Sequence, residues 1–229
     1  MKRLLWITGM CLLVLLVGCQ PKITPTESPT STVLSATPLP QTDPTQSPPS
    51  VDTPDEIQPT EVPVIADVPW IADGVVTPGE YSREAEIRGI RLWWRNDAEY
   101  LYMAMEGATS GWIAIGIEPS QGMKDADYIL GYVKDGEALI WDAFGTAPTG
   151  ANHPPDEELG GTNDIIAFAG VEENGITRFE FQIPLNSGDV YDKVLVPGGT
   201  YNIIVAMGRS DDFNAYHPTV GRGQITLDD

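Results

Sequence analysis

Short strand-like runs separated by turn signals limit what residues 67–229 can fold into. The runs are rich in β-branched and aromatic residues, and no 12-residue stretch shows a clear helical period. Strands at this spacing predict an all-β fold, an antiparallel sandwich of roughly nine to eleven strands. We place the strands near residues 83–94, 99–106, 111–117, 127–134, 137–143, 164–170, 175–183, 200–208 and 222–227.

Turn residues and side-chain alternation refine this prediction. Lys134-Asp135-Gly136 and Asn174-Gly175 are typical of tight hairpin turns, and Asn96-Asp97 predicts another. In the run 111–117, Ile113, Ile115 and Ile117 should share one face of a strand. Trp112, Ala114 and Gly116 should share the other face.

The preceding residues differ sharply in composition. The segment 20–66 holds 11 of the 20 prolines, many Thr and Ser, and neither Gly nor an aromatic residue. Such a segment cannot bury enough apolar surface to offset its chain entropy, so we expect a disordered linker. Its prolines would extend it as a stalk at ~3.1 Å per residue. The predicted divisions are a signal at 1–18, the linker at 19–66 and one folded domain at 67–229.

The extreme N-terminus predicts export. Lys2 and Arg3 precede an apolar stretch, 4–17, that is too short and wrongly flanked for a confident membrane span. Its end, Leu16-Val17-Gly18-Cys19, resembles the bacterial lipoprotein signal motif. The resemblance implies cleavage before Cys19 and acylation of Cys19, and therefore an extracytoplasmic lipoprotein anchored to a lipid membrane, at the cell surface or the periplasmic face. A secretory signal or an anchor helix, the alternatives, would also place the rest outside the cytoplasm.

Cysteine content and charge exclude several classes of site. Cys11 lies in the signal, so the mature chain has no cysteine besides Cys19. This excludes internal disulfides, thiolate zinc sites and iron–sulfur clusters, and any haem must be held non-covalently. Removal of 1–18, which contains Lys2, Arg3 and no acid, changes the net charge from −20 to −22. A surface so acidic should not bind nucleic acid.

Two loops each hold one residue able to bind a soft or borderline metal. Met123 follows the 111–117 run in a polar loop, and a thioether is a competent ligand of low-spin iron. His217 is one of two histidines, and the following Pro218 stiffens its loop. From position alone, Met123 could equally cap the edge of the core and His217 could be an ordinary surface histidine.

Further motifs accompany these two positions: 111–117, 126–133, 206–209, Tyr216-His217 and 221–227. Together with Met123, and in their order and spacing, these motifs resemble the DOMON domain family. The resemblance spans about 70–229 and implies an immunoglobulin-like β-sandwich. In cytochrome members, such as the haem domain of cellobiose dehydrogenase, haem b lies between a Met and a His, which correspond to Met123 and His217. Other members bind sugars or have unknown ligands.

A haem would also need an apolar slot and a cation near its propionates. Trp112 and Tyr128 are the expected cofactor-binding aromatics, and Arg209 or Arg222 would pair with a propionate. Each of these residues could instead be an ordinary core residue of the sandwich or an ordinary surface charge. His153 is expected to be exposed in a long loop. His153 and Lys124 are the two residues that could replace one of the proposed iron ligands. Further candidates for the slot are Ile115, Ile117, Trp141 and Met207.

The remaining signals do not indicate an enzyme. The acids lack the spacing of an EF-hand calcium loop and are expected to be solvated; they are Asp125, Asp127, Asp156, Glu157, Glu158 and Asp164. No serine-hydrolase elbow, zinc-protease or phosphate-loop motif is present.

The functional prediction is therefore a lipid-anchored b-type cytochrome domain that exchanges electrons with an unidentified redox partner and performs no catalysis itself. The alternative is a DOMON-like carbohydrate-binding or adhesion module without haem. Its sugar platform would use exposed aromatic side chains such as Trp93, Trp94 or Trp112.

Overall fold

The structure is a computed structural model that describes residues 60–61 and 68–229. The predicted signal, Cys19 and most of the predicted linker lie outside the described residues. The described part contains eleven strands and one short helix, α1 (Asp156–Leu159). No helix in this part is long and apolar enough to cross a membrane.

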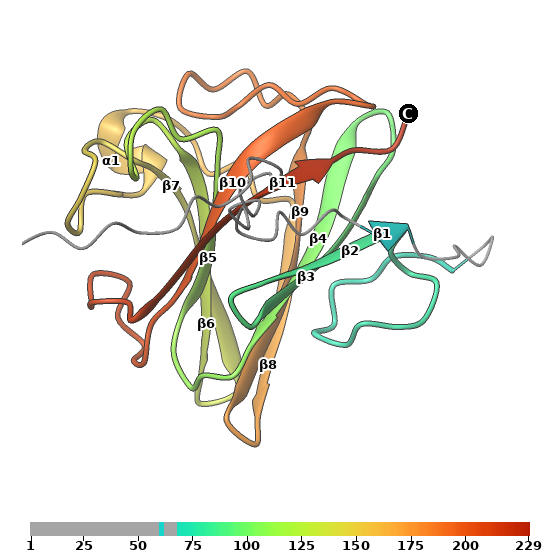
Figure 1. Ribbon diagram of the computed structural model, residues 1–229, viewed down its shortest axis with the longest axis horizontal. Coiled ribbons are helices and arrows are strands. Elements are labelled where there is room, and N and C mark those ends of the chain that lie inside the picture. The colour runs from blue at the N-terminus through green and yellow to red at the C-terminus, as the bar shows by residue number, and fades with distance from the viewer. Residues whose placement is uncertain (1–59, 62–67) are drawn as a thin grey trace, which may run out of the picture. The chain divides into compact units, whose positions relative to one another are not determined.

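The strands form two antiparallel sheets, which Figure 1 shows as two layers. This arrangement confirms the predicted all-β antiparallel sandwich. The six-stranded sheet has the order β1 (Thr60–Glu61), β2 (Arg83–Ile87), β3 (Ile90–Asn96), β4 (Tyr100–Gly107), β9 (Ile176–Pro184), β8 (Ala167–Glu173). The five-stranded sheet has the order β11 (Thr219–Thr226), β10 (Thr200–Met207), β5 (Ile113–Ile117), β6 (Asp127–Lys134), β7 (Glu137–Phe144).

The predicted hairpins are present, and one more was missed. Asp135-Gly136 and Asn174-Gly175 connect β6 to β7 and β8 to β9, with positive φ at both residues of each turn. The run 83–94, predicted as a single strand, is instead the hairpin β2–β3, with its turn at Arg88 (φ 56°) and Gly89 (φ 78°). Arginine is not among the residues that signal such a turn, so the break was not visible in the sequence.

The main hydrophobic core lies between the sheets. Ile113, Ile115 and Ile117 of β5 point into it, as their alternation predicted, together with Trp94 of β3 and Phe181 of β9. A second hydrophobic cluster covers the opposite face of the five-stranded sheet, and a third covers the opposite face of the six-stranded sheet. Each sheet is therefore buried on both faces over part of its area.

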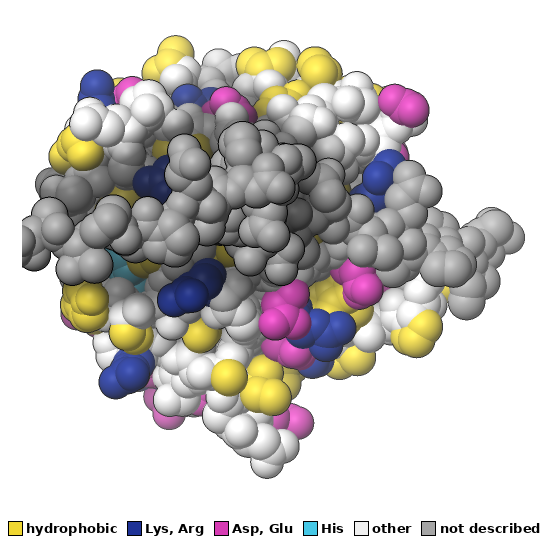
Figure 2. All heavy atoms as spheres, in the orientation of Figure 1, with side chains coloured by type: hydrophobic (Ala, Val, Ile, Leu, Met, Phe, Trp, Pro, Cys, Tyr) yellow, Lys and Arg dark blue, Asp and Glu magenta, His cyan; other side chains and the backbone are white. Residues whose placement is uncertain are grey.

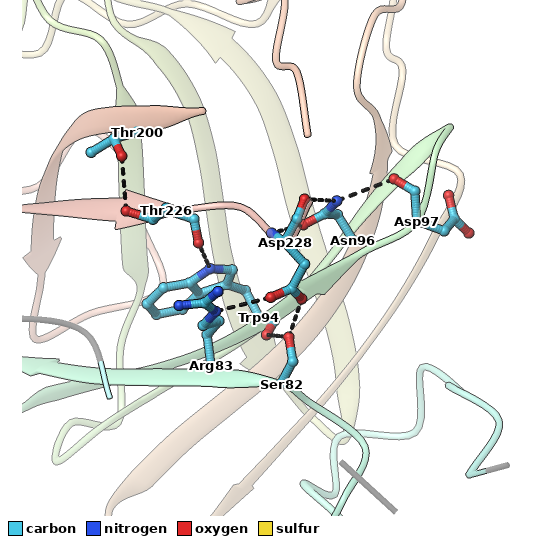
Figure 3. A network of polar contacts seen from close by, with 8 residues as sticks. All are labelled: Ser82, Arg83, Trp94, Asn96, Asp97, Thr200, Thr226 and Asp228. Carbon is cyan, nitrogen blue, oxygen red and sulfur yellow. Dashed lines mark hydrogen bonds and ion pairs between the residues drawn. The ribbon is translucent and has the colours of Figure 1, made fainter. Parts of the chain in front are cut away.

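Hydrogen bonds near the C-terminal end of the domain connect the two sheets (Figure 3). Trp94 Nε1 of β3 donates a hydrogen bond to the carbonyl of Thr226 in β11, at 2.9 Å. Just beyond β11, the Asp228 carboxylate accepts hydrogen bonds from Ser82 Oγ and Arg83 Nε. The amide of Asn96 exchanges two further hydrogen bonds with the Asp228 backbone.

Charged side chains are dispersed over the face shown in Figure 2. Basic and acidic side chains lie among hydrophobic ones, and the described part of this face carries no continuous acidic patch. The net charge of −20 therefore does not by itself mark a binding surface on this face.

Candidate functional site

The second hydrophobic cluster forms a floor on the outer face of the five-stranded sheet. Side chains on β5, β6 and β10 alternate, so those that point away from the main core gather on this face. Trp112 and Tyr128 are its large aromatic members, and both are buried. The remaining buried members are Ala114, Ala126, Leu130, Ala143, Ile204 and Phe213.

Two glycines allow the aromatic side chains to lie close to the backbone. A Cβ at Gly116 would lie 2.5 Å from the ring of Tyr128, on the neighbouring strand. A Cβ at Gly208 would lie 2.3 Å from Nε1 of Trp112. The glycines therefore set the positions of Tyr128 and Trp112 on the floor, because any larger residue would displace the rings.

Backbone hydrogen bonds fasten the loop that carries Met123 to a second loop, residues 145–152. Met123 N donates to the carbonyl of Pro148 at 3.0 Å, and Asp125 N donates to that of Gly145 at 2.7 Å. Gly122 has φ +61°, and a Cβ there would lie 2.2 Å from the Pro148 oxygen. The Met123 side chain is half-buried and packs against the second cluster.

His217 lies on the opposite loop, residues 208–218, and faces the same floor. Phe213 anchors this loop, since its ring packs between Tyr132 and Trp141 with centroids 4.7 and 4.6 Å away. The imidazole of His217 is half-buried against the edge of Trp112, and Tyr216 stacks on it from the exposed side.

His153 is buried, so the prediction that it is exposed was wrong. Only 5% of its surface is accessible, and its ring lies 5.8 Å from that of Tyr128. Its loop folds back along β7: Phe144 N donates to the Pro154 carbonyl, and Ala143 forms a β-bridge with Pro155. These long-range backbone contacts turn His153 toward the floor.

Met123, His153 and His217 all line one cavity above this floor. Its volume is about 520 Å³, within the usual range of ligand pockets. Arg222 and Tyr216 also line it. A smaller apolar hollow shares the same three side chains and reaches Trp112 and Tyr128. The structure thus brings together the two predicted ligands, Met123 and His217, and adds His153.

Four buried polar atoms around the cavity have no hydrogen-bond partner among the described residues. They are Trp112 Nε1, Tyr128 Oη, His153 Nδ1 and His217 Nδ1. Burial lowers the pKa of both histidines, and the nearby His217 lowers that of His153 further. Both imidazoles are therefore neutral near pH 7, the form that binds metals. Unpartnered buried polar atoms are costly, so they indicate a place where a ligand or water completes the site.

Residues 89–208 match the DOMON domain family, which is more than half of the chain. The chain belongs to this family. The matched range contains Met123 and His153 and ends before His217. No curated protein matched the chain.

Three solved structures resemble the DOMON domain described here. The cytochrome b domain of pyranose dehydrogenase from Coprinopsis cinerea is 14% identical, with TM-score 0.43 over 61% of this chain and 77% of that one. The cytochrome domain of Myriococcum thermophilum cellobiose dehydrogenase is 14% identical, with TM-score 0.41 over 60% and 74%. A family 9 carbohydrate-binding module from Caldicellulosiruptor kristjanssonii, in complex with glucose, is 13% identical, with TM-score 0.38 over 73% and 94%.

Several other predicted cavity residues of the DOMON domain lie elsewhere. Ile115 and Ile117 belong to the main core, and Met207 packs against that core, because their strand faces point inward. Trp141 packs on the second cluster beside Phe213 and lines neither the cavity nor the smaller hollow.

The positively charged residues predicted for the site also differ in their position relative to the cavity. Arg222 lines the cavity, since it follows Val220 on the outward face of β11, opposite Ile204. Arg209 is exposed and does not line the cavity. Lys124 is exposed and lies 3.6 Å from the Asp125 carboxylate.

The aromatic platform expected for a sugar-binding module is not exposed. Trp94 belongs to the main core, Trp112 to the second cluster and Trp93 to the third. At most 7% of the surface of any of the three is accessible. The three tryptophans therefore form no exposed aromatic platform, and of the three only Trp112 lines the hollow beside the cavity.

Two acids predicted to be solvated are also buried. Asp127 begins β6, and Asp156 begins α1; 4% and 1% of their surfaces are accessible. Their burial depends on contacts between distant segments, so sequence spacing alone could not show it.

Proposed function

We propose that this DOMON domain binds haem b non-covalently and transfers electrons through it, with Met123 and His217 as axial ligands. The observation that carries the proposal is that these two side chains, 94 positions apart in sequence, line one cavity over an apolar floor. A bound haem would supply reversible one-electron chemistry at its iron.

The donor set of the cavity fits this group. Met123 offers a thioether and His217 a neutral imidazole, a pair that holds iron in electron-transfer cytochromes. Trp112 and Tyr128 would provide an apolar floor for the haem, and Arg222 lines the cavity, where it could pair with a propionate carboxylate. The unpartnered nitrogens of the two histidines and of Trp112 are consistent with a ligand that completes the site.

The same residues favour electron transfer over catalysis. Two protein ligands leave no coordination position for a substrate, so the domain would only accept and donate electrons. The apolar floor excludes water, and a thioether ligand raises the reduction potential relative to a second imidazole. We further propose that acylated Cys19 and the Pro-rich linker tether the domain outside the cytoplasm, within reach of a redox partner.

Haem titration tests the proposal. The purified protein would be titrated with haemin, and absorption spectra recorded before and after reduction. Low-spin α and β bands should appear on reduction, and both Met123→Ala and His217→Ala should abolish them. Lys124→Ala should retain them, because that side chain is exposed.

His153→Ala decides which histidine is the ligand. If it removes the bands while His217→Ala does not, the His217 assignment is wrong. Failure of the wild-type protein to retain haem would overturn the cytochrome proposal as a whole. Binding of soluble glucans by such a haem-free protein would instead support the carbohydrate-binding alternative.

A further inference from the structure

A cluster of three carboxylates, two of them buried, lies on the other face of the five-stranded sheet, the face that points toward the main core. Carboxylate oxygens of Asp127, Asp142 and Asp192 lie within 4.8 Å of one another. Asp142 of β7 is directly opposite Ile129 of β6, a main-core residue, so Asp142 and Asp127 share its inward face. Asp192 reaches them from the loop between β9 and β10. Three segments thus converge on one point.

A fourth carboxylate, outside this trio, is the observation that points to a ligand. Asp156 is 1% exposed, and neither of its carboxylate oxygens accepts a hydrogen bond from a backbone N–H or a basic side chain of the described residues. The bridge between Ala143 and Pro155 holds the start of α1 beside β7, next to Asp142. The carboxyl groups of Asp156 and Asp192 lie within hydrogen-bonding reach of each other, so Asp156 borders the trio.

The cluster lacks cationic partners among the described residues. None of the four aspartates forms a salt bridge with a described Lys, Arg or His. Two backbone N–H groups contribute: Lys193 N donates to Asp127 Oδ2 at 3.0 Å, and Asp164 N donates to Asp142 Oδ2 at 2.7 Å. Burial, and then the neighbouring carboxylates, raise the pKa of Asp156 to about 8. Without a cation, the simultaneous ionisation of all four carboxylates is unfavourable in a folded core.

We propose that Asp127, Asp142, Asp156 and Asp192 bind one Ca²⁺. The donors are all oxygens, which selects a hard cation. Both oxygens of Asp156 and Oδ1 of Asp192 accept no hydrogen bond from a backbone N–H, and Asp127 and Asp142 each keep one such free oxygen. Ca²⁺ takes 6–8 oxygen ligands in flexible geometry, whereas Mg²⁺ retains several waters. Carboxylates that converge from separate segments therefore suit Ca²⁺ better than Mg²⁺.

A bound Ca²⁺ would stabilise the loops around the candidate haem cavity from the opposite face of the sheet. Asp127 directly follows the loop that carries Met123, and Asp156 follows the loop that carries His153. Ca²⁺ would therefore fix the ends of both loops to β6 and β7. The binding of Ca²⁺ does not depend on haem, so the experiment below uses haem-free protein.

Calorimetric titration of the chelator-treated full chain tests this site. CaCl₂ should bind with one equivalent per chain, and MgCl₂ should bind roughly tenfold or more weakly. Saturating Ca²⁺ should raise the unfolding temperature, since only the folded chain assembles the site. Asp156→Asn and Asp192→Asn should each weaken Ca²⁺ binding roughly tenfold or more. Without Ca²⁺, both variants should unfold at or above the wild-type temperature, because each removes a carboxyl group whose ionisation the cluster disfavours.

Asp135→Asn is the matched control, because Asp135 is exposed in the β6–β7 turn and outside the cluster. It should bind Ca²⁺ as the wild type does. The proposal is overturned if wild-type protein shows no stoichiometric Ca²⁺ binding, or if its unfolding temperature is the same in Ca²⁺ and in chelator. Equal affinity for Mg²⁺ would overturn the assignment to calcium.

Discussion

The imidazole of His217 lies edge-on to the indole of Trp112, with 5.6 Å between the ring centroids and 79° between the ring planes. Trp112 is buried in the cluster on the sheet, so the sheet as well as the loop orients His217. His153 has an equivalent partner, since its ring lies 5.8 Å from that of Tyr128. Each histidine of the cavity therefore contacts its own aromatic residue on the floor.

This pairing predicts different effects for two similar substitutions, Gly208→Ala and Gly116→Ala. Both should destabilise the domain by about 1–3 kcal/mol, because each new methyl overlaps an aromatic ring. Gly208→Ala displaces Trp112 and with it His217, so it should weaken or abolish the low-spin haem spectrum. Gly116→Ala displaces Tyr128 and should leave Met/His ligation intact. Urea unfolding and reduced-state spectra of the two variants measure both effects. A wild-type spectrum in Gly208→Ala would show that Trp112 does not orient His217.

A buried carboxylate on the six-stranded sheet predicts a pH-dependent stability. Glu180 is fully buried and accepts hydrogen bonds from Asp73 N, Gly74 N and the hydroxyl of Tyr81. Glu180→Gln should cost about 1–3 kcal/mol at neutral pH, because the hydroxyl of Tyr81 loses its acceptor.

Burial raises the pKa of Glu180, although these hydrogen bonds oppose the rise. The folded protein therefore takes up a proton at a higher pH than the unfolded chain, and this group adds stability as the pH falls. The stability advantage of the wild type over Glu180→Gln should increase from neutral pH toward the ordinary glutamate pKa, as measured by urea unfolding at each pH. Glu173→Gln, at the exposed end of β8, is the control for removing a carboxylate that is not buried. A shrinking advantage on acidification would mean that the hydrogen bonds outweigh burial.

Local patterns in the sequence predicted the sheets well because strand alternation and Gly-containing turns act over a few residues. They placed Ile113, Ile115 and Ile117 on the core face and located two tight hairpins. The resemblance to the DOMON family singled out Met123 and His217, which no local pattern could pair. These parts of the prediction depended on short-range geometry or on motif order.

The errors arose where burial depends on contacts between distant segments. His153 is buried because its loop pairs with β7, and Asp156 because the bridge at Pro155 holds α1 beside that strand. Trp93 is buried because the segment 68–82 packs over the outer face of its sheet, through Trp70 and Tyr81. In each case the covering segment, and not the residue's own surroundings in the sequence, decides its exposure.

The Asp228 network in Figure 3 should contribute to global stability. Asp228→Ala removes the acceptor of Ser82 Oγ and Arg83 Nε and should destabilise the domain by about 1–3 kcal/mol. Chemical denaturation would measure the loss. Asp229→Ala is the matched control, since that residue is exposed and outside the network, and it should stay close to the wild type. Equal stability of the two variants would show that the network adds nothing to the packing of Trp94.

The two candidate propionate partners, Arg222 and Arg209, can be separated by one pair of substitutions. Arg222 lines the cavity, whereas Arg209 is exposed and lies outside it. If haem binds in the cavity, Arg222→Ala should weaken haemin affinity by about two- to fivefold, the usual range for a solvent-exposed ion pair. Arg209→Ala should leave it unchanged. Haemin titration at low and high salt measures the difference, which should diminish as salt screens the pair. An equal loss in both variants would indicate a general effect of charge, and an effect of Arg209→Ala alone would place the propionates away from β11.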